Sequence, residues 1–139
     1  MEIKKLLLVF IYLTLTCSCY ASGGNSINNV VEDKFESHYN SWASCRNTTS
    51  LKFSSNAKDY LKCDGYKETV QMGDIALPYL ISKIIEDKNN GFSKGDFILW
   101  HAIYDISGIK LFKDEEIQVS EQEIALRYVD WWQATLKKK

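Results

Sequence analysis

The sequence predicts an all-α fold, a compact bundle of about five helices closed by a C-terminal helix rich in tryptophan. Apolar residues recur every three or four positions along several stretches, as on the buried face of a helix. Residues that commonly cap helices, such as serine, asparagine and glycine, stand at the ends of these stretches. The length of 139 residues, 45% of them hydrophobic, fits one globular domain.

The first 21 residues predict a secretory signal peptide, so we expect a single domain over residues 22–139. Lys4 and Lys5 precede an apolar run at residues 6–15, and small residues end at Ala21, the expected cleavage position. A spanning helix needs about 20 apolar residues, so this run is too short for a retained membrane anchor. The protein is therefore expected to be exported, to the periplasm or beyond.

A lipid anchor is the alternative for the same segment. Cys17 or Cys19 directly follows the apolar run and would be the modified first residue of a bacterial lipoprotein. The residues before Cys17 are Thr14, Leu15 and Thr16, which fit such a motif poorly. The sequence leaves both a soluble exported protein and a lipid-anchored envelope protein open.

Two helices are predicted in the first half of the domain. One covers roughly residues 27–43, after a small polar tether at residues 22–26. The next begins at Asn56, whose amide is a typical N-cap, and ends before Gly73, which suits the left-handed conformation that closes helices. Gly65 lies inside this second helix and weakens its propensity by about 1 kcal/mol.

Three further helices complete the predicted bundle. The third starts at Asp74, with Pro78 in its first turn, where a missing N–H is no loss. The fourth begins with Asp96 as a candidate cap, is apolar almost all round and stops at Gly108, so it is the expected central core helix. The fifth follows a capping box at residues 120–123 and carries the tryptophans near the C-terminus.

Cys45 and Cys63 are the only cysteines left after removal of the signal peptide, and we expect them to form a disulfide. An exported protein meets an oxidising environment, in which such bridges persist. The bridge would close a loop of about 19 residues and stabilise the fold by roughly 3 kcal/mol. The spacing is unlike the C-x-x-C pattern of redox-active thiols.

Three segments resemble a HEAT-like helical hairpin found in small bacterial proteins. They are residues 70–81 (VQMGDIALPYLI), residues 100–108 (WHAIYDISG) and a terminal YVDWW at residues 128–132. The resemblance implies a protein-binding scaffold, because HEAT-like units act in this way and prescribe no chemistry. One hairpin falls short of the three repeats that a solenoid needs, which favours a compact bundle.

The candidate catalytic residues are few. His101 lies four residues before Asp105, which places both on one helix face and would make a minimal general-base pair. The alternative is that His101 packs at the edge of the core and forms local hydrogen bonds. The sequence contains no cluster with zinc-ligand spacing, no P-loop and no nucleophile elbow. We therefore expect a protein that is not an enzyme, with no metal and no cofactor.

Aromatic side chains are the better indication of a binding surface. Trp42, Trp131 and Trp132 are the candidates, since boundary aromatics serve as binding anchors, although packing in the core is the alternative for each. The net charge of −1 gives no basic face for nucleic acid. The leading hypothesis is an exported, non-enzymatic protein-binding module of the cell envelope, such as an immunity protein that neutralises a periplasm-acting toxin.

Two alternatives from other classes stay open. One is an envelope protein that binds a small ligand or glycan through exposed aromatic rings. The other is a hydrolase that uses His101 and Asp105.

Overall fold

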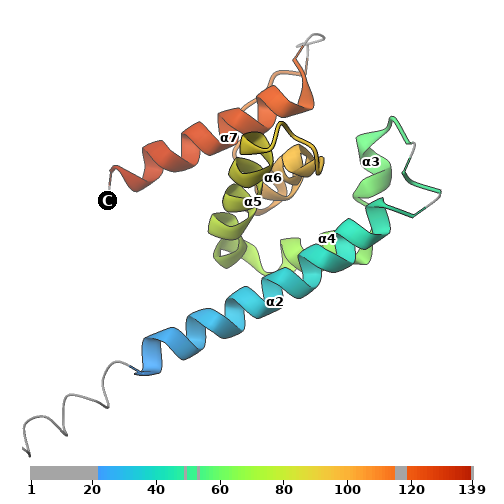
Figure 1. The fold of residues 1–139 in the computed structure, drawn as a ribbon. Helices are drawn as coiled ribbons and strands as arrows, with labels where there is room; N and C mark the ends of the chain where they lie inside the picture. Colours follow the sequence, from blue (N-terminus) through green and yellow to red (C-terminus); the bar gives the residue numbers. More distant parts are fainter. Residues whose placement is uncertain (1–21, 49, 53, 115–118, 139) are drawn as a thin grey trace, which may run out of the picture. The chain divides into compact units, whose positions relative to one another are not determined.

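A computed structural model describes residues 22–48, 50–52, 54–114 and 119–138, and within these ranges the chain is all-α, with helices and no strand (Figure 1). The all-α prediction is confirmed. In chain order the elements are α2 (Ser22–Arg46), α3 (Ala57–Tyr60), α4 (Asp64–Gln71), the 3-10 helix η1 (Gly73–Ala76), α5 (Leu77–Asn89), the 3-10 helix η2 (Asp96–Leu99), α6 (Trp100–Ser107) and α7 (Glu121–Leu136).

The predicted signal peptide at residues 1–21, including the two cysteines Cys17 and Cys19 of the lipid-anchor alternative, lies outside the described residues. Among the helices that are described, none combines the length and the apolar character needed to cross a membrane.

The chain divides into two units, residues 1–34 and residues 35–139. In the described part of the first unit the chain is helical from Ser22, so the expected tether at residues 22–26 is wrong. Ile27 and Val30 of this unit are exposed, at 69% and 65%. The spacing of apolar residues shows only where a helix has a face to bury. The backbone of α2 is helical before that face begins, so the prediction placed the helix start about five residues too late.

The second unit is built around one core to which α2, η2 and the helices α4 to α7 contribute. Its large, fully buried side chains come from distant parts of the chain and include Trp42, Leu80, Leu99, Ile103 and Tyr128. The core is therefore assembled from residues that lie far apart in the sequence.

The predicted second helix is interrupted. Asn56 caps α3 as expected, accepting from the Lys58 backbone N–H at 3.1 Å, but α3 ends at Tyr60. Cys63 then takes an extended backbone conformation, with φ −63° and ψ 140°, and serves as the N-cap of α4. The single predicted helix is wrong because an extended residue at 63 cannot continue α3.

Gly65 has a packing role that propensity alone did not reveal. A Cβ added there would lie 2.4 Å from the backbone N of Trp42 and 2.6 Å from the carbonyl O of His38. Only glycine permits this close approach of α4 to α2. Across the same crossing, His38 Nδ1 lies 3.0 Å from Glu68 Oε2.

The third and fourth predicted helices are each confirmed, with a 3-10 turn at the start. Pro78 lies in the first turn of α5, as expected. Gly108 closes α6 with φ 68°, and Gly73 also adopts a left-handed backbone, with φ 66°. Ser120 caps α7 by accepting from the Glu123 backbone N–H at 3.2 Å.

Candidate functional site

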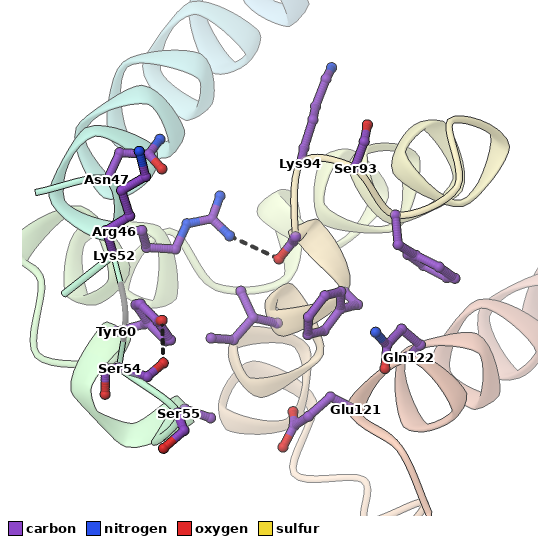
Figure 2. A pocket seen from close by; sticks show the side chains of 15 residues that line it. Arg46, Asn47, Lys52, Ser54, Ser55, Tyr60, Ser93, Lys94, Glu121 and Gln122 are labelled. Carbon is purple, nitrogen blue, oxygen red and sulfur yellow. Dashed lines mark hydrogen bonds between the residues drawn. The ribbon is translucent and has the colours of Figure 1, made fainter.

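A cleft of about 510 Å³ lies within residues 35–139 and is the candidate site (Figure 2). One wall consists of the end of α2 and the segment that follows it, Arg46, Asn47, Lys52, Ser54, Ser55, Ala57 and Tyr60. The other wall consists of the residues around the α5–η2 loop and the start of α7, Phe92, Ser93, Lys94, Gly95, Phe97, Ile98, Glu121 and Gln122. We call these the 46–60 wall and the 92–98 wall.

The 46–60 wall is closed by a disulfide. Cys45 and Cys63 are bonded at 2.05 Å, with their Cα atoms 6.1 Å apart, which confirms the predicted bridge. Within the loop that it closes, the Trp42 indole donates to the Tyr60 carbonyl at 2.9 Å, and the Tyr60 hydroxyl donates to the Ser54 carbonyl at 2.6 Å. Apart from Arg46 at the end of α2 and the four-residue helix α3, the described residues of this wall are irregular, so these contacts define its shape.

The 92–98 wall is organised by the buried carboxylate of Asp87, at the end of α5. Its two oxygens accept from the backbone N–H groups of Lys94, at 2.7 Å, and Asp96, at 2.6 Å. The Asp87 carbonyl accepts from the Phe92 N–H at 2.7 Å. Hydrogen bonds to a charged group are stronger than those between neutral groups, so the Asp87 carboxylate anchors the backbone of this loop.

Phe92 has a strained backbone. Its φ is 56°, a left-handed conformation that bulky residues rarely adopt, and its ring lines the cleft. Gly91 and Gly95 on either side are also left-handed, with φ 67° and 73°. Strain of this kind persists only where the surroundings impose it, and it clusters at functional sites.

A buried ion pair joins the two walls. Arg46 Nη2 donates to Asp96 Oδ1 at 2.8 Å, and Arg46 Nη1 donates to the Gly95 carbonyl at 3.0 Å. The Tyr39 hydroxyl donates to the other oxygen of Asp96 at 2.7 Å. Burial, followed by this hydrogen bond to Asp96, raises the pKa of Tyr39, so the phenol stays protonated and can donate.

The role expected for Asp96 was wrong. The N-cap of η2 is Gly95, and Asp96 is buried, with 1% of its surface exposed. Sequence reasoning also missed Arg46, because its partner lies 50 positions along the chain. Asp87 was detectable, since it follows Leu80 and Ile84 by seven and three positions and therefore lies on their buried face.

His101 and Asp105 do not form the hypothesised pair. His101 Nε2 lies 3.2 Å from Glu121 Oε2, and Asp105 accepts instead from the Tyr66 hydroxyl. The Trp100 indole donates to the same Glu121 oxygen at 2.5 Å. The hydrogen bond from His101, and then that from Trp100, lowers the pKa of Glu121, so the carboxylate is held charged at the edge of the cleft.

The three candidate tryptophans differ in position. Trp42 is fully buried, so the structure corrects its placement on a binding surface: its ring packs against Tyr66 at 4.9 Å inside the core. Trp131 and Trp132 are half-buried on α7, with ring centroids 6.0 Å apart. Neither lines the cleft.

No group of three or more metal-binding side chains occurs among the residues that the structure describes. Comparison of the chain with protein-family models, with curated proteins and with solved structures found no match. The HEAT-like hairpin therefore stays a prediction, and the function has to be argued from the cleft.

Proposed function

We propose that the chain is an exported, non-enzymatic module of the cell envelope that binds a protein partner through the cleft between the 46–60 wall and the 92–98 wall. The observation that carries this proposal is that both walls are held by internal bonds in the absence of a ligand. The Cys45–Cys63 bridge holds one wall, the Asp87 carboxylate holds the other, and the Arg46–Asp96 pair joins them. A pre-organised site loses little conformational freedom on binding.

The lining supports recognition better than catalysis. Ser54 donates to Asp59 at 2.7 Å and so braces its own segment. Glu121 accepts from Trp100 and pairs with His101. These polar groups are occupied by structural partners, which suits a rigid binding surface.

A concave site with half-buried rings is where a partner inserts an anchoring side chain. Tyr60, Phe92 and Phe97 line the cleft from both walls, and buried anchors of this kind carry most of the energy of a protein interface. A periplasmic immunity protein that masks a toxin is the most concrete form of the proposal.

Co-expression tests it. Each neighbouring gene product that proves toxic in the periplasm is co-expressed there with the wild-type chain, with Phe92→Ala, or with Ile75→Ala as a matched control. The absence of rescue from any of them would count against an immunity protein. Ile75 is exposed, at 53%, and does not line the cleft. We expect the wild type and Ile75→Ala to rescue growth and to bind the toxin in calorimetry, and Phe92→Ala to do neither. Equal binding by Phe92→Ala would exclude the cleft as the interface.

A small ligand or a glycan is the second candidate, and the size of the cleft favours it. A volume of about 510 Å³ lies within the usual range of small-molecule sites. The Trp100 indole is bonded to Glu121 at the cleft edge, so its fluorescence should report a bound ligand. Unchanged fluorescence and melting temperature on titration with cell-wall fragments would remove this candidate.

A further inference from the structure

The charged side chains that line the cleft are unequally occupied. Three are cations, Arg46, Lys52 and Lys94, and one is an anion, Glu121. Glu121 is already engaged by Trp100 and by His101. The one carboxylate of the lining therefore already has hydrogen-bond partners, whereas not every cation of the lining has one.

Lys52 is the uncommitted cation. Its side chain is exposed, and it makes no hydrogen bond or ion pair within the described part of the chain. Lys94 pairs with Glu86 at 2.5 Å, but both side chains are about half exposed, at 50% and 51%. Exposed pairs of this kind contribute little, so a ligand can recruit Lys94 as well.

The charge of Arg46 is balanced by the Asp96 carboxylate, so Arg46 adds little net positive charge to the cleft. Two of its nitrogens bind Asp96 and Gly95, and its Nε is buried with no hydrogen-bond partner. A positively charged ligand would meet the unpaired Lys52 at the rim, and the one acidic side chain of the lining, Glu121, is already hydrogen-bonded.

The interior of the cleft has a different character. Tyr60, Phe92, Phe97 and Ile98 supply an apolar lining between the two walls. A single inorganic anion would leave this surface wet. A ligand that suits both the basic rim and the apolar interior has an apolar side chain next to a carboxylate.

We infer that the cleft selects an acidic–apolar peptide segment of the partner, with its carboxylate at Lys52 and its apolar side chain between Tyr60 and Phe92. This inference rests on the proposed function and names the chemistry that the partner must present. Charge complementarity at the rim determines which segments bind, and packing against the aromatic rings determines how slowly they dissociate.

Peptide selection tests the inference directly. The full chain, its Lys52→Glu variant and its Lys88→Glu variant are each used to select from a display library of random short peptides. Lys88 is an exposed lysine of α5 that does not line the cleft, so it is a matched charge-reversal control. We expect the wild type and Lys88→Glu to enrich peptides that join Asp or Glu to an aromatic or aliphatic residue. Lys52→Glu should lose the acidic preference.

The leading peptide is then measured by fluorescence anisotropy beside its amide counterpart, in which Asn or Gln replaces the acid. The amide form should bind the wild type about two- to fivefold more weakly, and Lys52→Glu should remove that difference. Melting curves of Lys52→Glu and Lys52→Gln check that the fold is kept. Nitrogen-labelled chain should show the largest amide shifts at Ser55, Ser93 and Lys94.

Several outcomes would overturn the inference. Selection of basic or neutral peptides, no enrichment at all, or shifts confined to α7 would each do so. Displacement of the peptide by free phenylpropanoate at equal affinity would assign the cleft to small carboxylic acids instead. If these results appear while Phe92→Ala still abolishes toxin binding, the acidic-segment inference fails and the proposed function stands.

Discussion

The two walls of the cleft are held in place by different chemistry. The 46–60 wall is closed by a covalent bond and contains few elements of regular structure. The 92–98 wall is held by one buried carboxylate, that of Asp87, which accepts from two backbone N–H groups of the loop. A loop without secondary structure can thus be held in two ways. A disulfide reduces the conformational entropy of the unfolded chain, whereas hydrogen bonds to a buried carboxylate lower the free energy of the folded state.

Removal of Asp96 should have the largest effect, because both walls depend on it. In Asp96→Ala the largely buried Arg46, 11% of whose side chain is exposed, loses its partner, and breaking a buried ion pair costs about 3–5 kcal/mol. Urea unfolding measures the loss. Asp130→Ala, at an exposed position of α7, is the control and should change stability by less than about 0.5 kcal/mol. Equal effects of the two variants would contradict the buried pair.

Removal of the disulfide should destabilise the 46–60 wall and leave the 92–98 wall unchanged. The double variant Cys45→Ser, Cys63→Ser should lose about 2–4 kcal/mol, because the unfolded chain regains the freedom of the loop. Hydrogen exchange should accelerate at residues 50–61, while the amides of Lys94 and Asp96 keep their protection.

The bridge itself has a chemical check. Denatured protein that was purified without a reductant should yield no titratable thiol from Cys45 or Cys63. Two free thiols at these positions would show that the wall is not closed covalently.

Asp87→Asn should loosen only the second wall. The amide keeps the shape of the side chain but replaces one acceptor oxygen by a donor, so one N–H of the loop is left without a partner. We expect a loss of about 1–3 kcal/mol, the usual penalty for an unsatisfied buried group. Faster exchange at Lys94 or Asp96, with unchanged exchange at residues 50–61, completes the comparison with the cysteine variant.

Phe92→Gly should change stability little and function strongly. Glycine relieves the strain of the left-handed backbone but removes the ring of Phe92, whose centroid lies 6.1 Å from that of Phe97. These opposing contributions to stability are each about 1 kcal/mol. A melting temperature near that of the wild type with lost partner binding would separate the ring's role in recognition from the loop's role in folding. A large fall in melting temperature would assign the ring to the core instead.

The smallest effect is expected from Glu121→Gln, and it depends on pH. Because His101 and Trp100 lower the pKa of Glu121 in the folded state, the charged carboxylate stabilises the fold above the ordinary pKa of a glutamate. That contribution disappears as pH falls through the lowered value. The wild type should therefore exceed Glu121→Gln slightly in melting temperature at neutral pH, and the two should converge in acid. A difference that grows in acid would contradict the assigned direction.

Sequence reasoning predicted one wall much better than the other. Cys45 and Cys63 are the only cysteines outside the predicted signal peptide, so only one pairing was possible there. The Arg46–Asp96 pair joins residues 50 positions apart, and no local pattern encodes such a distance. Only tertiary packing decides which of the many charged residues meet.

Local signals were read correctly where the backbone follows its own preferences. Pro78, Gly108 and Ser120 all mark helix ends as predicted. The break before α4 was missed because an extended Cys63, bonded to Cys45, overrides the helical tendency of its neighbours. Gly65 was read as a weakness because propensity takes no account of a second helix at contact distance.

The covalent closure of one wall also decides what a protease can do to the molecule. A single backbone cut between residues 46 and 62 opens that wall yet leaves one covalent molecule until a reductant is added, since the Cys45–Cys63 bond spans the cut. A cut between residues 92 and 95 instead divides the chain into two fragments joined only by non-covalent contacts. In a compartment rich in proteases, the irregular wall is thus the one that can be nicked without separating the chain into pieces.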